Sequence, residues 1–166
     1  MKLLPTVAAA VQLFATQVMA NGFAFYSGHW DIQGRHEIQI YSFVRNSDIM
    51  NYNNTCDDLS ASPLYQPIDS AKDVDNRRGI YCVGDGCSWT SPDPLNMESM
   101  EMNITQGRYT WTLSSDGMMQ DHKTGWIVGL CLPWNSTFSM LDCPSPNDRN
   151  ARLKMTPVLD CDIVNW

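Results

Sequence analysis

The sequence predicts an all-β protein, a single-domain, disulfide-stapled β-barrel or sandwich of about eight strands. Three observations lead to this fold class. Apolar residues recur with a period of two along much of the chain, which is typical of strands with one buried face. Turn-forming residues separate these runs, and six cysteines are available to link a small core.

The beginning of the chain has the features of a secretory signal peptide. Lys2 supplies a positive charge, an apolar stretch follows, and the small residues Val18 and Ala20 precede the expected cleavage site. The stretch is too short, and too interrupted by polar residues and proline, to span a bilayer. We therefore expect residues 1–20 to be a signal peptide and residues 21–166 to form one secreted, extracellular domain.

The strands are expected in this order along the chain: 23–26, 30–33, 35–44, 79–83, 100–104, 109–113, 126–132, 136–143 and 151–158. The clearest pair is 100–104 and 109–113, because both alternate around a Gln106–Gly107 turn, which is typical of a hairpin. The run 126–132 is almost entirely apolar, so we expect a buried strand with Trp126 in the core. Residues 57–76 are expected to be irregular, and no segment has the pattern of an amphipathic helix.

The six cysteines all follow the predicted cleavage site, and an even number in a secreted chain predicts disulfide bonds. They are Cys56, Cys82, Cys87, Cys131, Cys143 and Cys161. The closest two, Cys82 and Cys87, do not have the spacing of a zinc site, so we expect no metal and no cofactor. Sequence alone leaves the pairing open.

Three sequons predict N-glycosylation at Asn53, Asn103 and Asn135. Strand alternation points Asn103 away from the apolar face of its hairpin, where a glycan can be accommodated. Together with the signal peptide, the sequons favour a secreted eukaryotic glycoprotein.

The net charge of −7 makes the chain a poor match for nucleic-acid phosphates. After the signal peptide, no stretch is long and apolar enough for a membrane helix. We therefore expect neither nucleic acid nor a membrane as a partner.

Residues with catalytic chemistry are few. Arg35, His36 and Glu37 are the residue types of a ribonuclease, but neighbours on a strand point to opposite faces. A G-x-S-x-G motif is absent. We expect a non-enzymatic protein, and the alternative is a secreted hydrolase such as a ribonuclease-like toxin that uses His36 or His122.

Two tryptophans, Trp89 and Trp134, fall in predicted loops and are the candidate partner-binding residues. Exposed aromatic side chains suit protein partners or stacking on sugars. The alternative is that these rings cover the ends of the barrel. A cell-wall carbohydrate-binding module would instead present two or three coplanar tryptophans.

The order of strands and cysteines resembles the Alternaria major allergen family of secreted fungal β-barrel proteins, which includes plant-defence elicitors. The matching features are Cys56, the segment 80–82, the hairpin 100–113, and the strand that ends at Cys131, with Cys143 following twelve residues later. The resemblance implies the bridges Cys56–Cys82 and Cys131–Cys143, which leaves Cys87 and Cys161 to pair with each other.

Together these observations predict a non-enzymatic, secreted fungal cysteine-rich protein that acts by binding at the host interface. The partner is expected to be a host extracellular protein or a cell-wall glycan, and the role that of an allergen-like effector or elicitor of plant defence.

Overall fold

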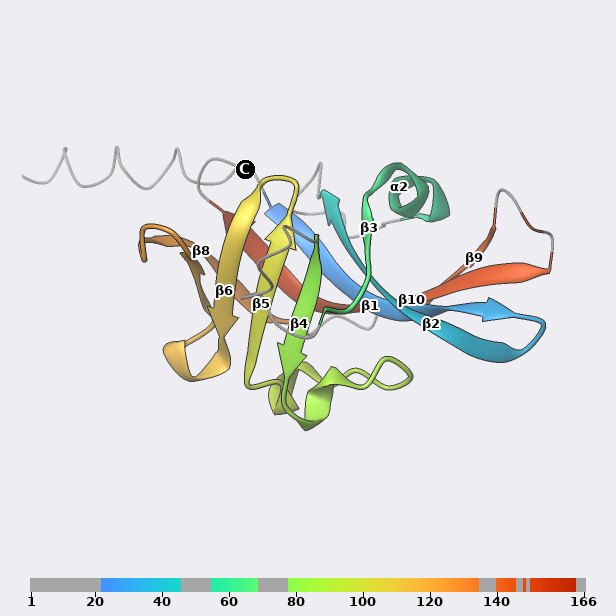
Figure 1. Ribbon diagram of the computed structural model, residues 1–166, viewed down its shortest axis with the longest axis horizontal. Coiled ribbons are helices and arrows are strands. Elements are labelled where there is room, and N and C mark those ends of the chain that lie inside the picture. Colours follow the sequence, from blue (N-terminus) through green and yellow to red (C-terminus); the bar gives the residue numbers. More distant parts are fainter. Residues whose placement is uncertain are drawn as a thin grey trace, which may run out of the picture.

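The computed structural model describes residues 22–45, 55–68, 78–134, 140–145, 148 and 150–163. The predicted signal peptide and the sequons at Asn53 and Asn135 lie outside the described residues. The described strands form one 10-stranded sheet of order β3-β2-β1-β10-β8-β7-β6-β5-β4, and β9 pairs with β10 beside this path (Figure 1).

The strands are β1 (Gly22–Ile32), β2 (Arg35–Arg45), β3 (Leu64–Tyr65), β4 (Gly79–Val83), β5 (Ser99–Ile104), β6 (Gly107–Thr112), β7 (Met118–Asp121), β8 (Ile127–Pro133), β9 (Leu141–Pro144) and β10 (Ala151–Ile163). The helices are short: α2 (Cys56–Ala61) and the 3₁₀ helices η1 (Asp85–Cys87), η2 (Pro94–Asn96) and η3 (Leu113–Ser115).

The sheet curls into a nearly closed antiparallel β-barrel, so the predicted fold class is confirmed. The segment after β3 reaches β4 through a parallel bridge between Pro67 and Ile80. There the Ile68 N–H donates to the Ile80 carbonyl at 2.9 Å, and the Ile80 N–H donates to the Gln66 carbonyl at 3.0 Å. These bonds bring the two ends of the strand order together.

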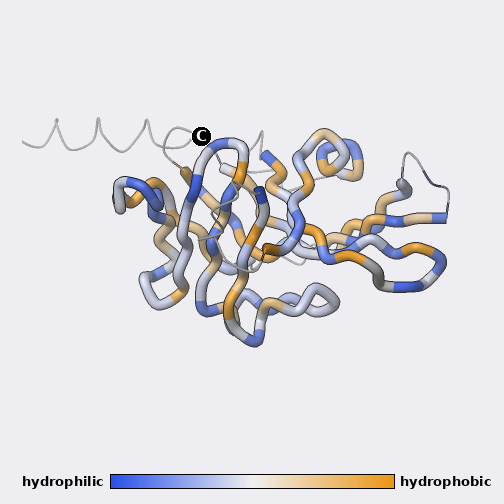
Figure 2. The backbone as a smooth tube through the Cα atoms, viewed as in Figure 1, coloured by the Kyte–Doolittle hydropathy of each residue, from blue (hydrophilic) through white to orange (hydrophobic). Residues whose placement is uncertain are grey.

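The β5–β6 hairpin is confirmed, but its two-residue turn lies at Thr105 and Gln106, one residue earlier than predicted. Met100 pairs with Trp111, and Ile104 pairs with Gly107 at the turn. Met100 and Ile104 are buried, whereas Asn103 is half-buried on the opposite face, as predicted. Apolar and polar residues alternate along the strands, as the changes of colour along the tube show (Figure 2).

Two apolar clusters lie on opposite faces of β1, β2 and β10. The larger fills the barrel and contains Phe25, whereas the smaller contains the next residue on β1, Tyr26, and packs under α2 through Leu59. This alternation on a single strand explains why the strands beside α2 are apolar on both faces.

The region predicted to be irregular, 57–76, contains most of α2 and all of β3, so that part of the prediction is wrong. The helix begins at a capping box: the Asp58 N–H donates to the Thr55 hydroxyl at 3.4 Å, and the Thr55 N–H donates to the Asp58 carboxylate at 2.8 Å. A capping box stabilises even a single-turn helix, which is too short to show an amphipathic period.

The three disulfide bonds are Cys56–Cys143, Cys82–Cys87 and Cys131–Cys161. The two pairs implied by the family resemblance, and the pair of Cys87 with Cys161 that they left over, are therefore wrong. The strand register explains why Cys131 and Cys143 do not pair, because Cys131 lies opposite Cys161 on β10 whereas Cys143 lies opposite Leu153. Those two β10 positions are about 26 Å apart along the strand, far beyond the reach of a disulfide.

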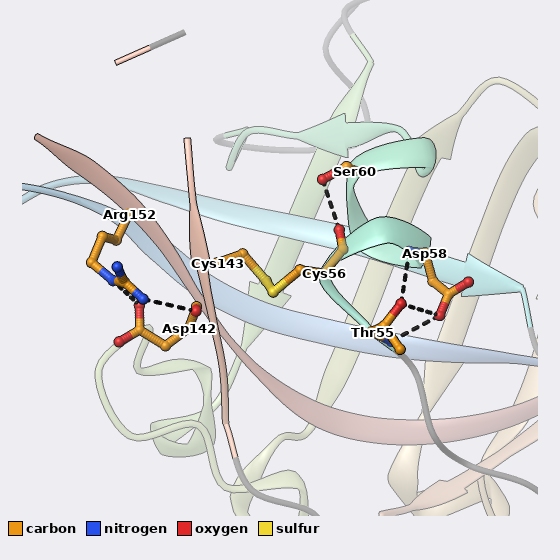
Figure 3. The surroundings of a disulfide bond; sticks show 7 residues. All are labelled: Thr55, Cys56, Asp58, Ser60, Asp142, Cys143 and Arg152. Atoms are coloured by element: carbon orange, nitrogen blue, oxygen red, sulfur yellow. Dashed lines mark hydrogen bonds and ion pairs between the residues drawn. A yellow bond between two sulfur atoms is a disulfide. The ribbon is translucent and has the colours of Figure 1, made fainter. Parts of the chain in front are cut away.

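The Cys56–Cys143 bond ties α2 to β9 across the smaller cluster (Figure 3). Next to it, Arg152 of β10 donates to the side chain of Asp142 at 2.5 Å and to its backbone carbonyl at 3.1 Å. Cys82 and Cys87 instead close the short connection between β4 and η1.

Replacing both cysteines of a bridge by alanine tests the covalent framework. Loss of Cys56–Cys143, which closes the longest loop, is expected to cost about 4–5 kcal/mol, loss of Cys131–Cys161 about 3–4, and loss of Cys82–Cys87 about 2. Urea unfolding of the three double variants measures this order. A cost for Cys82–Cys87 that equals or exceeds the cost for Cys56–Cys143 would contradict it.

A buried tyrosine gives a second test of the core. Burial raises the pKa of Tyr41 to about 12, although a hydrogen bond from the Gln39 side chain acts in the opposite direction. An unfolded tyrosine titrates near about pH 10. Because the folded pKa is the higher one, the stabilisation is complete below about pH 10 and is lost towards pH 12, by about 3 kcal/mol at most.

The Tyr41→Phe variant is expected to lack the latest phase of an absorbance titration at alkaline pH. Its free energy of unfolding should also fall less between about pH 10 and 12 than that of the wild type. Identical titrations of the two proteins would show that Tyr41 is not buried.

Candidate functional site

The two predicted partner-binding tryptophans are both half-buried and pack against the body of the protein. The Trp89 ring, just after η1, makes an edge contact with His29 of β1 at a centroid distance of 5.2 Å. Trp134, just after β8, packs against the smaller cluster, and its backbone N–H donates to the Val158 carbonyl at 2.8 Å. These contacts favour the covering role that the sequence left open.

The largest exposed apolar surface of the described residues instead lies on β8 and its neighbour β7. We call it the β8 face. It consists of Met118, Trp126, Ile127, Leu130 and Leu132, with exposed fractions of 36%, 77%, 58%, 40% and 52%. The prediction that Trp126 is a core residue of a buried strand is therefore wrong.

Alternation across β8 explains the exposure of Leu130 and Leu132, whereas a shift of register between β7 and β8 turns Ile127 outward. Cys131 is 1% exposed and points into the barrel, so its neighbours Leu130 and Leu132 point outward. Met118 of β7 lies directly opposite Leu130 and extends the apolar surface sideways. An antiparallel sheet with one face on the core leaves the other face to solvent, and the described residues leave the outside of β8 uncovered.

The turn between β7 and β8 is held by Asp121. Its carboxylate accepts from the Thr124 N–H at 2.7 Å and from the Thr124 hydroxyl at 2.8 Å, and these bonds lower its pKa. The Asp121 N–H donates to the Trp126 carbonyl at 2.9 Å, and Gly125 between them has a φ of +70°, a conformation that favours glycine. These hydrogen bonds hold the turn that carries Trp126 at Asp121, Thr124 and Trp126 itself.

The inner side of β8 is equally well fixed. The Trp111 indole N–H donates to the Cys131 carbonyl at 3.1 Å, and the Cys131 N–H donates to the Gly117 carbonyl at 2.8 Å. A Cβ atom at Gly117 would lie 2.2 Å from the Cys131 carbonyl oxygen, so only glycine fits there. The β8 face is therefore carried on rigid backbone.

Charges around the β8 face are unevenly placed. On β10, Asp162 lies opposite Leu130 and Asp160 lies opposite Leu132. Asp116 is exposed in the turn that leads into β7. The end of the face at Leu130 and Leu132 is thus flanked by carboxylates on both sides.

The two histidines of the alternative hydrolase lie on different elements, His36 in β2 and His122 in a turn. The backbone of His36 lies opposite Asp31 near the tip of the β1–β2 hairpin, and its side chain is outside the described atoms. His122 is exposed in the turn between β7 and β8. The backbone register thus gives no reason for these two histidines to share a substrate.

A partly buried ion pair links β1 to β10. Lys154 of β10 donates to Asp31 of β1 at 2.5 Å, and this hydrogen bond raises the pKa of Lys154. An ion pair between adjacent strands is ordinary sheet stabilisation. In the part of the chain that the structure covers, no cluster of three or more His, Cys, Asp or Glu side chains is placed to hold a metal ion.

No described helix has the length and apolar character needed to cross a membrane. Comparisons with known proteins find no matching family model, no matching curated protein and no matching solved structure.

The opposite placements of two tryptophans give a direct test of the β8 face. Trp126→Phe is expected to change the free energy of unfolding by less than about 0.5 kcal/mol and to lower the acrylamide-quenchable fluorescence. Trp111→Phe removes the donor to the buried Cys131 carbonyl and is expected to cost about 1–3 kcal/mol. Equal destabilisation by the two variants in urea unfolding would contradict the placement of Trp126.

Proposed function

We propose that this chain is a secreted, non-enzymatic binding protein that meets a host protein outside the cell, as an effector or elicitor of plant defence. The resemblance to the Alternaria major allergen family belongs to the same proposal. It now depends on the order of the strands, because the bridges that it implied are wrong.

The observation that carries the proposal is the β8 face. Its apolar residues lie on neighbouring strands and on the turn that joins them: Met118 of β7 pairs with Leu130 of β8, and Trp126 in the turn is 77% exposed. Contiguous exposed apolar side chains on a folded domain mark surfaces for a partner, and tryptophan is over-represented among the residues that dominate binding energy. A strand-borne surface also loses little conformational entropy on binding.

The disulfide framework supports action outside the cell. Three bridges with no free cysteine among the described residues suit an oxidising compartment. By keeping the open state rare, they also protect the chain against extracellular proteases.

Binding to protein is favoured over binding to a cell-wall glycan by the tryptophans. Of those that the structure describes, Trp126 is the exposed one, whereas Trp111 is fully buried and Trp30, Trp89 and Trp134 are half-buried. A platform of two or three coplanar rings is therefore not formed by the described tryptophans.

Infiltration of purified protein into leaf tissue tests the proposal. The wild type is expected to elicit a defence response, and the double variant Trp126→Ser/Leu132→Ser is expected to need about 30-fold more protein or to fail, because an aromatic anchor contributes about 2 kcal/mol or more. Both substitutions are on the outer surface, so the melting temperature should be unchanged.

The matched control is Leu95→Ser in η2, which removes an apolar side chain that is 69% exposed away from the β8 face. Its response should equal that of the wild type. No response to the wild type and no captured protein in any plausible host would count heavily against the proposal, and so would equal responses to the double variant and the wild type.

A further inference from the structure

We infer that the partner of the β8 face is a protein segment with an apolar centre and a lysine or arginine that lies beside Asp162. The inference rests on the proposed function, since it names the chemistry of the partner for the same surface. Charge complementarity carries it.

The carboxylates belong to the same outer surface as the apolar residues. Cys161, between Asp160 and Asp162, is 1% exposed and bonded to Cys131 inside the barrel. The two aspartates therefore point outward, about 7 Å apart along β10. Asp162 is exposed and lies directly opposite Leu130.

A third carboxylate, that of Asp116, lies on the β7 side of the Leu130–Leu132 end of the β8 face. Asp116 is exposed immediately before β7, next to Gly117, which accepts the Cys131 N–H. Leu132 thus lies between an acidic group on the β10 side and another on the β7 side. An apolar partner group seated on Leu130 and Leu132 partly desolvates its surroundings, and there an opposite charge is worth more than in open water.

Cations lie at the opposite end of the face. Lys123 is exposed in the turn that also carries Trp126, and Arg108 of β6 is half-buried beside that turn, where its carbonyl accepts the His122 N–H. The Asp121 carboxylate in the same turn partly offsets the charge of Lys123, so a cationic group of the partner is favoured at the Leu130–Leu132 end over the Trp126 end. The structure predicts an orientation of the segment as well as its composition.

The same charges disfavour other occupants. A second copy of this chain, with its net charge of −7, would bring acidic surfaces together, and an anionic lipid surface would be repelled. A segment with an apolar centre and a positive flank matches both the apolar side chains of the β8 face and the carboxylates beside them.

The test uses two synthetic peptides of equal length, in which leucine alternates with lysine in one and with glutamate in the other. Binding to the disulfide-bonded protein is measured by calorimetry at low and at physiological salt. The lysine peptide is expected to bind, and more weakly at higher salt. The glutamate peptide is expected not to bind.

Variants separate this face from the overall acidity of the chain. Asp162→Asn should weaken binding of the lysine peptide about two- to fivefold, and Asp162→Lys should weaken it further. Glu98→Gln also removes one negative charge, but just before β5 and away from the β8 face, so it should have no effect. Leu130→Ser/Leu132→Ser keeps the net charge and should abolish binding.

Equal binding of both peptides that still needs Leu130 and Leu132 would overturn the cationic partner and leave the proposed function standing. Failure of both peptides, with a leaf response that still depends on Trp126, would do the same. Dimers in sedimentation that Leu130→Ser abolishes would make a second copy the occupant. Retention on phosphatidylcholine vesicles that Leu130→Ser abolishes would make a lipid surface the occupant of the β8 face. Either result overturns the inference.

Discussion

The disulfide between Cys131 and Cys161 is the constraint on which the rest of the structure depends. It joins β8 to β10 in the ladder that makes the N-terminal strands β1, β2 and β3 continuous with the meander from β8 back to β4. Both cysteines are 1% exposed and directly opposite each other in the ladder. Without this junction, pairing between the two groups of strands would be limited to the bridge of Pro67 with Ile80, and β8 and β10 would have open edges that invite other pairings.

The same bond determines what β8 shows to solvent. Because a strand alternates, a cysteine fixed inside the barrel forces Leu130 and Leu132 outside. The Cys131 carbonyl accepts the Trp111 indole N–H, which holds the inner side of the strand against the core. A slip of one residue would bury Leu130 and Leu132 and expose the Cys131 sulfur. The disulfide therefore fixes which side chains of β8 form the β8 face.

Local features could be read from the sequence, and non-local ones could not. The β5–β6 hairpin follows from residues that are adjacent in the chain, although its turn lies at Thr105 and Gln106, one residue before the predicted turn at Gln106 and Gly107. Disulfide pairing depends on which strands become neighbours, and Cys131 finds its partner 30 residues away by register with β10. Trp126 was misplaced because a run that is apolar on both faces does not say whether its outer face is covered. The signal that could have shown it was available, since an all-antiparallel fold seldom covers both sides of a strand.

Peptide mapping of the unreduced protein after enzymatic removal of any glycans tests the central claim most directly. Trypsin separates the cysteines into the segments 46–72, 79–108, 124–149 and 155–166. The structure predicts that 79–108 is released alone with an internal bridge and that the other three segments stay joined. A second cut before Asp142 then leaves Cys131 with Cys161 and Cys143 with Cys56. Release of 124–149 alone, with Cys131 bonded to Cys143, would contradict both the junction and the β8 face.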